Sequence, residues 1–149
     1  MSKLLKDQSL LEDLNDHELA EVSKFIKDLK FKKGDHIFKE NEDTKGLYLI
    51  KSGKVEVAKV TSDGWKQTLA VFTEGHFFGE LSILENRQHQ AFAVATENTE
   101  VFLIGKEDFE KLEREVSPIA FKILKKLALV MCKNIRRMNE KFLNALISY

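Results

Sequence analysis

The sequence predicts an α+β, mainly β domain in which an antiparallel barrel or sandwich of short strands lies between an N-terminal helix and a long C-terminal helix. All seven glycines fall between Gly34 and Gly105, and short apolar runs of strand character separate them. Apolar residues at helical spacing before and after this region predict the flanking helices. At 149 residues, the chain is long enough for one domain with a core of its own.

The N-terminal helix is expected from about Asp16 to Lys30. Apolar residues recur there at helical spacing, at Leu19, Val22, Ile26 and Leu29. Asn15 is a favourable N-cap residue, and Glu18 follows three positions later, as in a capping box.

Five runs between the glycines have the composition of strands. They are His36–Phe38, Leu47–Ile50, Lys54–Ala58, Gln67–Phe72 and Val101–Ile104. The sequence Ser62-Asp63-Gly64 predicts a tight hairpin between the third and fourth runs, because Asp-Gly accepts positive φ at little cost. Short strands with glycine turns are typical of antiparallel barrels and sandwiches.

Two helices are expected after the strands. The first begins near Phe109, and the second begins with Ser117 as N-cap and Pro118 as its first residue, with no helix breaker before Leu146. Eight apolar residues of the second helix are spaced alternately by three and four: Phe121, Leu124, Ala128, Met131, Ile135, Met138, Phe142 and Ala145. Such a seam is typical of a coiled coil and predicts a homodimer, with a wide core-facing helix in a monomer as the alternative.

The division that we expect is a domain with its flanking helices over residues 1–116 and a continuous dimerisation helix over residues 117–149. The region from Ser117 onward carries seven Lys or Arg and one Glu, a net charge of +6, so the remainder carries −6. A basic tail can contact nucleic acid or a membrane surface. We favour the alternative, a solvated helix face beside an acidic body.

Composition also excludes several classes of protein. The chain contains no eighteen consecutive apolar residues, and acidic residues interrupt its N-terminus, so we expect no membrane span, no signal peptide and a cytoplasmic protein. Cys132 is the only cysteine, which excludes an internal disulfide and a cysteine-based zinc site. We interpret Cys132 as a small buried apolar residue.

Three stretches, in order, resemble the cyclic-nucleotide-binding domain family of the catabolite activator and the regulatory subunits of cyclic-AMP-dependent kinase. They are FKKGDHIF from Phe31, LYLIKSGKV from Leu47 and GHFFGELSIL from Gly75. The resemblance covers about Phe25 to Phe109. It implies an antiparallel double-stranded β-roll, jelly-roll-like, that serves as a non-enzymatic sensory or regulatory module. Its implied ligand is a cyclic nucleotide or another anionic small molecule, with no cofactor.

The third stretch resembles the start of the family's phosphate-binding cassette. The resemblance implies a ligand site at Phe78, Gly79, Glu80, Leu81, Ser82, Arg87, His89, Gln90 and Ala91. Gly79 allows close approach of backbone N–H groups, and Glu80 can accept a hydrogen bond from a ribose hydroxyl. Leu81 and Ser82 open a short helix whose free N–H groups suit a phosphate. The alternative is a plain tight turn with an acid facing solvent.

One position of the cassette departs from the family. The family has an arginine nine residues after the glutamate, and here that residue is His89. Arginine is a permanently charged fork, whereas neutral histidine offers one donor. Losing a charge-assisted bidentate contact costs roughly 1.5–3 kcal/mol, or about 10- to 150-fold in affinity. We therefore predict weak or absent cyclic AMP binding, with Arg87 as the residue best placed to substitute.

Three other functions stay open. A metal enzyme on the related cupin barrel needs His-x-His and a nearby glutamate, but Glu74 precedes His76, so no catalytic or metal site is expected. A ligand-free dimerisation or adaptor domain would agree with the change at His89. A regulatory fragment of a transcription factor would normally be followed by a helix-turn-helix. The sequence stops at Tyr149, so we expect no specific DNA binding.

Overall fold

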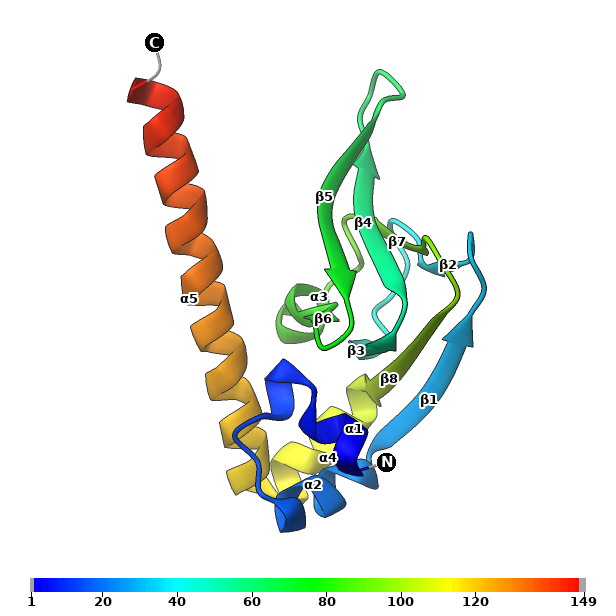
Figure 1. Ribbon diagram of the computed structural model, residues 1–149, viewed down its shortest axis with the longest axis vertical. Helices are drawn as coiled ribbons and strands as arrows, with labels where there is room; N and C mark the ends of the chain where they lie inside the picture. Colours follow the sequence, from blue (N-terminus) through cyan, green and yellow to red (C-terminus); the bar gives the residue numbers. More distant parts are fainter. Residues whose placement is uncertain (1, 148–149) are drawn as a thin grey trace.

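Two four-stranded antiparallel sheets form a β-roll (Figure 1), as the computed structural model shows; it describes residues 2–147, without the side chains of residues 2, 3, 81 and 82. The first sheet has the order β1 (Ile26–Phe31), β8 (Thr99–Gly105), β3 (Gly46–Ser52) and β6 (Phe77–Phe78). The second has the order β2 (His36–Phe38), β7 (Phe92–Ala95), β4 (Lys54–Val60) and β5 (Lys66–Thr73). The predicted fold class is confirmed.

Helices gather at one end of the roll and along one side of it. They are α1 (Ser2–Lys6), the 3-10 helix η1 (Ser9–Leu11), α2 (Asp16–Ser23), α3 (Glu80–Glu85), α4 (Lys106–Glu115) and α5 (Ser117–Ile147). In Figure 1 the base of α5 lies beside α2 and α4, and the rest of α5 rises away from them next to the roll. None of the helices in the described part of the chain is both long enough and apolar enough to cross a bilayer.

The strand β3 separates two hydrophobic clusters. Leu47 and Leu49 face the helices, whereas Tyr48 and Ile50 face the interior of the roll, and side chains of β8 alternate in the same way. Because both faces of the sheet are covered there, every residue from Gly46 to Ile50 is buried. The continuous apolar run in the sequence follows from this double burial.

The N-terminal helix is predicted correctly at its start and wrongly at its end. The Asn15 side chain accepts from the Glu18 N–H at 2.9 Å, and the Glu18 carboxylate accepts from the Asn15 N–H at 3.0 Å. The helix ends at Ser23, however, and Ile26–Phe31 forms β1, which pairs with β8 along its whole length. This ladder outweighs the helical spacing of the apolar residues, because tertiary pairing overrides local propensity.

Several smaller predictions also differ from the structure. All five predicted strands are present, but β1, β6 and β7 were not predicted as strands. Ser117 is the first residue of α5, and its hydroxyl donates to the Glu113 carbonyl at 2.8 Å, so it closes α4 and does not cap α5. Cys132 is exposed, contrary to expectation. The body buries α5 residues only as far as Leu127, and Cys132 lies beyond that point.

The predicted seam on α5 is uncovered over most of its length. Phe121, Ile135, Met138 and Phe142 are 56–67% exposed. Ala128 and Ala145 are exposed as well, whereas Leu124 and Met131 are half-buried. A different stripe of the helix packs on the core and is formed by Ile119, Ala120, Ile123 and Leu127. One side of α5 therefore packs on its own domain, and most of the seam remains exposed.

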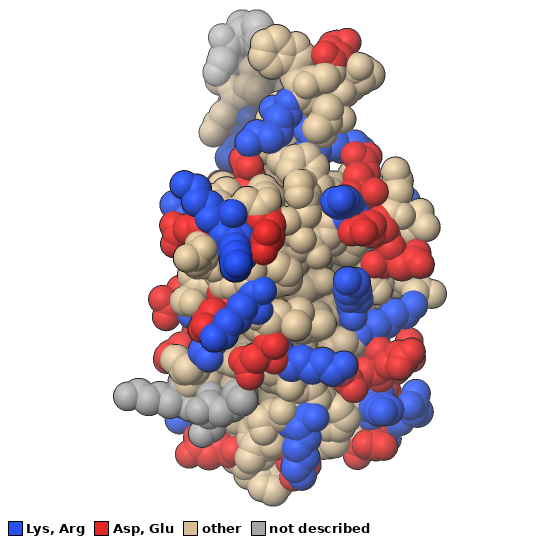
Figure 2. Space-filling model, turned by 90° about the vertical axis from the view of Figure 1, so that its right-hand side faces the viewer, with Lys and Arg blue, Asp and Glu red and all other residues tan. Residues whose placement is uncertain are grey.

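The side of the molecule that carries β1, β2 and β8 is strongly charged. Figure 2 shows acidic and basic side chains interleaved across this face. Glu100 pairs with Lys30 at 3.4 Å and with Lys51 at 3.8 Å, and the Lys51 ammonium lies 5.6 Å from the centre of the Phe102 ring. Exposed pairs of this kind contribute little stability, so their main effect is to balance charge locally.

Candidate functional site

A cavity of about 380 Å³ lies between strands β4 and β5 and the segment that runs from β6 to β7. Seven of the nine residues predicted for the ligand site line it: Phe78, Gly79, Glu80, Arg87, His89, Gln90 and Ala91. The other two, Leu81 and Ser82, belong to α3, and their side chains lie outside the described residues. The volume is within the range of small-molecule sites.

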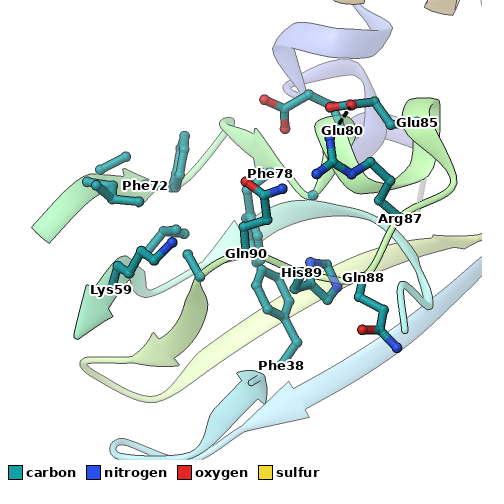
Figure 3. Close-up of a pocket in the computed structure, with 15 residues that line it drawn as sticks. Phe38, Lys59, Phe72, Phe78, Glu80, Glu85, Arg87, Gln88, His89 and Gln90 are labelled. Carbon is teal, nitrogen blue, oxygen red and sulfur yellow. Dashed lines mark hydrogen bonds and ion pairs between the residues drawn. The ribbon is translucent and has the colours of Figure 1, made fainter. Parts of the chain in front are cut away.

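Eight further lining residues were not predicted from the sequence. They are Phe38, Val57, Lys59, Leu69, Ala70, Phe72, Glu85 and Gln88. Alternation along the two predicted hairpin strands is the signal that could have found part of this set. Val57 and Lys59 share one face of β4, and Ala70 and Phe72 share one face of β5. In Figure 3 Lys59 and Phe72 lie at one end of the cavity and Arg87 at the other.

Gly79 fixes the turn between β6 and α3 against the wall of the roll. Its φ is +90°, a conformation that suits glycine. A Cβ at this position would lie 3.0 Å from the Gly46 carbonyl oxygen and 3.3 Å from the Tyr48 ring. The backbone next to the cavity therefore lies directly on β3, and there is little room for a side chain.

Glu80 is the first residue of α3 and is half-buried in the cavity wall. Burial raises the pKa of its carboxyl group, and a hydrogen bond to its own backbone opposes this shift. Loss of hydration makes the charged carboxylate less favourable. Hydrogen-bond donors on a bound molecule would replace part of that hydration.

His89 is 3% exposed and stacks on Phe38, with ring centroids 3.6 Å apart and an interplanar angle of 5°. Its backbone is fixed on both sides: the His89 N–H donates to the Glu42 backbone carbonyl at 2.9 Å, and the Asn41 N–H donates to the His89 carbonyl at 2.8 Å. Burial lowers the pKa of His89, and the nearby Glu42 carboxylate opposes the shift. The imidazole is therefore neutral near pH 7.

Arg87 lines the cavity at its rim and is paired within the same loop. Its Nη1 donates to Glu85 Oε2 at 2.9 Å, and both side chains are more than half exposed (Figure 3). A ligand that binds Arg87 has to compete with this ion pair. Among the described residues, no three His, Cys, Asp or Glu side chains are grouped as metal ligands would be.

Comparison with known proteins identifies the family. The model of the cyclic nucleotide-binding domain matches residues 28–115, more than half of the chain. The chain belongs to the cyclic-nucleotide-binding domain family. The resemblance deduced from the sequence is thereby confirmed. The matched residues include the turn at Gly79, Glu80 and His89.

Relatives of this domain are regulatory proteins. The cyclic AMP receptor protein of Thermus thermophilus is 31% identical over 83% of this chain and 57% of its own length. The crystal structure of the Thermus thermophilus catabolite activator protein superimposes with a TM-score of 0.79 at 28% identity, covering 91% of this chain and 62% of that chain. The chain therefore spans about three fifths of these two relatives.

A kinase subunit is a third relative. The regulatory subunit of a cAMP-independent protein kinase A from Trypanosoma brucei, in a triple mutant bound to cAMP, superimposes with a TM-score of 0.71 at 25% identity. The match covers 85% of this chain and 45% of that chain.

Replacing Gly79 with alanine should destabilise the protein more than replacing Gly64. Both have left-handed backbone, with φ of +90° and +85°, and alanine there costs about 1–3 kcal/mol. Only Gly79 also meets a backbone oxygen at 3.0 Å, whereas nothing lies within 4 Å of a Cβ at Gly64. Urea unfolding of both variants tests this, and equal losses would contradict the close approach at Gly79.

The burial of neutral His89 predicts a pH dependence of stability. Because the folded-state pKa lies below the ordinary value of 6.5, the unfolded chain binds more protons as the pH falls below about 6.5. The contribution of His89 to the free energy of unfolding is therefore fully present above that pH and is lost below it. His89→Gln should remove this part of the decline in urea unfolding between pH 7.5 and 5.5.

The exposed His17 supplies the matched control, as His17→Gln. Should His89→Gln follow the pH dependence of the unmodified chain, the neutral state assigned to the buried imidazole would be wrong.

Proposed function

We propose that the chain is a non-enzymatic sensory or regulatory module that works as a homodimer and binds cyclic AMP weakly or not at all. The observation that carries this proposal is the state of His89, at the position where the family's cassette has arginine. The residue is buried and stacked on Phe38, and burial lowers the pKa of its imidazole. A neutral imidazole used in this way supplies no fixed charge for a phosphate.

Arg87 does not readily replace the missing arginine. Its guanidinium is paired with Glu85 at 2.9 Å, and phosphate binding would require that this pair separate. Separating an exposed ion pair costs only about 0–1 kcal/mol. A phosphate contact made by the exposed Arg87 guanidinium is, however, weaker than one made by a buried arginine. This comparison supports weak binding and agrees with a residual affinity through Arg87.

The homodimer is proposed from the exposed seam of α5. After Leu127, the last buried residue of this helix, twenty residues extend for about 30 Å. Their exposed large side chains include Ile135, Met138 and Phe142, which lie on the seam. Contiguous exposed apolar surface of this kind is typical of an interface, and a repeat of three and four fits a second identical helix.

His89→Arg should strengthen cyclic AMP binding about 10-fold or more, because it adds a fixed charge and a bidentate donor pair. Isothermal titration calorimetry with the unmodified chain and the variant measures the change, and a thermal melt checks that the variant folds. Gln88→Arg is the matched control, since it adds the same charge to the cavity lining at the neighbouring position. An equal gain in both variants would show that net charge alone is responsible.

No gain in a folded His89→Arg variant would favour the ligand-free adaptor function. Tight cyclic AMP binding by the unmodified chain would contradict the proposal directly and indicate that Arg87 has taken the role.

Met138→Glu should convert the protein to a monomer, because it places two facing carboxylates in the seam. Multi-angle light scattering at tens of micromolar measures the molecular mass. Arg137→Glu is the control: its charge change is larger, but it lies outside the seam and should leave the dimer intact. If the unmodified protein is a monomer at this concentration, the dimer proposal is wrong.

A further inference from the structure

We infer that one end of the molecule docks on an anionic lipid bilayer through the tip of the β4–β5 hairpin and the outer turns of α5 (residues 128–147). Both elements project from the body toward the same end of the molecule in Figure 1. This inference goes beyond the proposed function and does not depend on it. The apolar residues that carry it lie outside the cavity and outside the seam.

The outer turns of α5 expose a second group of apolar side chains. Leu143, Leu146 and Ile147 are 55–79% exposed, and none of them belongs to the seam. With 3.6 residues per turn, Leu143 and Ile147 point roughly a quarter turn or more away from the line through Ile135 and Phe142. A second helix that covers the seam therefore leaves them exposed, and exposed apolar groups of this kind mark an interaction site.

The hairpin adds an aromatic side chain at its tip. Trp65 is 76% exposed, and Val60 at the end of β4 is 49% exposed. The turn pairs its own backbone groups, since the Thr61 N–H donates to the Trp65 carbonyl at 2.8 Å and the Gly64 N–H to the Thr61 carbonyl at 2.9 Å. A turn satisfied in this way enters the interfacial region of a bilayer at lower cost, and tryptophan is enriched there. Asp63 in the same turn opposes anionic lipid, so the attracting charge has to come from α5.

The outer turns of α5 supply that charge. Lys133, Arg136, Arg137 and Lys141 are all exposed, and Glu140 is the one acid between them. Lysines at the base of the helix pair with acids of the N-terminal segment and α2, whereas within residues 2–147 these four basic side chains have no acidic partner. Basic residues beside exposed apolar ones are the pattern that anionic headgroups attract.

The shape of this end favours a bilayer over a protein groove. The hairpin tip and the outer turns of α5 are separate projections, so one partner has to meet both at once. Figure 2 shows this end as mostly uncharged atoms, with basic side chains grouped just below them. A flat bilayer fits this arrangement, because its acyl boundary receives the apolar tips while its headgroups meet the basic side chains.

The test is sedimentation of the full chain with phosphatidylcholine vesicles that contain about one third phosphatidylglycerol, beside vesicles of phosphatidylcholine alone. We expect binding to the anionic vesicles at about 0.1 M salt and its loss at about 0.5 M, because salt screens the attraction. Trp65 is the only tryptophan of the chain, so a blue shift of the emission reports entry of the hairpin tip. Asp63→Asn should strengthen binding.

Two leucines of α5 form a matched pair for the apolar contact. Leu143→Ser should weaken vesicle binding about 5- to 10-fold, whereas Leu129→Ser should leave it unchanged. The two side chains are 55% and 54% exposed and lie on the same side of the helix, but Leu129 is about 21 Å nearer the base.

The charge has its own matched pair of variants. Arg136→Gln with Arg137→Gln should weaken binding about 10-fold or more. Lys27→Gln with Lys111→Gln makes the same change in net charge on exposed residues of β1 and α4, at the opposite end of the molecule, and should have no effect.

The inference is overturned if the chain sediments with neither kind of vesicle or equally with both. It is also overturned if sedimentation leaves the Trp65 emission unchanged, or if Leu129→Ser and Leu143→Ser weaken binding equally. Tighter binding to a short DNA duplex than to the anionic vesicles would overturn it too, and would assign the basic side chains to nucleic acid.

Discussion

The pairing of β3 with β8 is the constraint on which the rest of the structure depends. These two central strands form a wall with the helices on one side and the interior of the roll on the other, so each contributes alternate side chains to both clusters. The strands approach so closely at Gly46 that a Cβ there would lie 2.1 Å from the Ile104 carbonyl oxygen. The cavity depends on the same wall, because the Gly79 turn lies against Gly46 and Tyr48.

The N-terminal segment connects β3 and the turn before β6 to α5. The buried Gln8 side chain donates to the Ile50 carbonyl at 2.8 Å, and the Ser9 hydroxyl donates to the Gly75 carbonyl at 3.0 Å, in the turn before β6. A few residues later, Glu12 pairs with Lys126 on α5. Part of the basic charge of the C-terminal helix is thus balanced by acids of the same chain, as the solvated-face interpretation expects. The end of β3, the turn before β6 and the helix α5 are therefore joined through one short N-terminal segment.

Local signals in the sequence were sufficient for much of the fold and for part of the site. The capping box at Asn15 and the glycine turns depend on neighbours within a few residues, so they can be deduced without the tertiary structure. The position of His89 could be found by counting from Glu80, but its stacking on Phe38 could not, because β2 and the cassette loop meet only in the folded chain. The same reason explains why Ile26–Phe31, which has helical spacing, becomes a strand against β8.

The uncovered half of α5 has a consequence for the helix itself. Helix formation has a costly nucleus, and helices shorter than about 12–15 residues are marginal in water. The packed stretch from Ile119 to Leu127 supplies the nucleus, so the following turns need only propagate from it. Without side-chain burial, each residue added to the helix changes the free energy only slightly. The outer turns are therefore poised between helix and coil, and the length of ordered helix depends on the protein concentration if a second copy covers them.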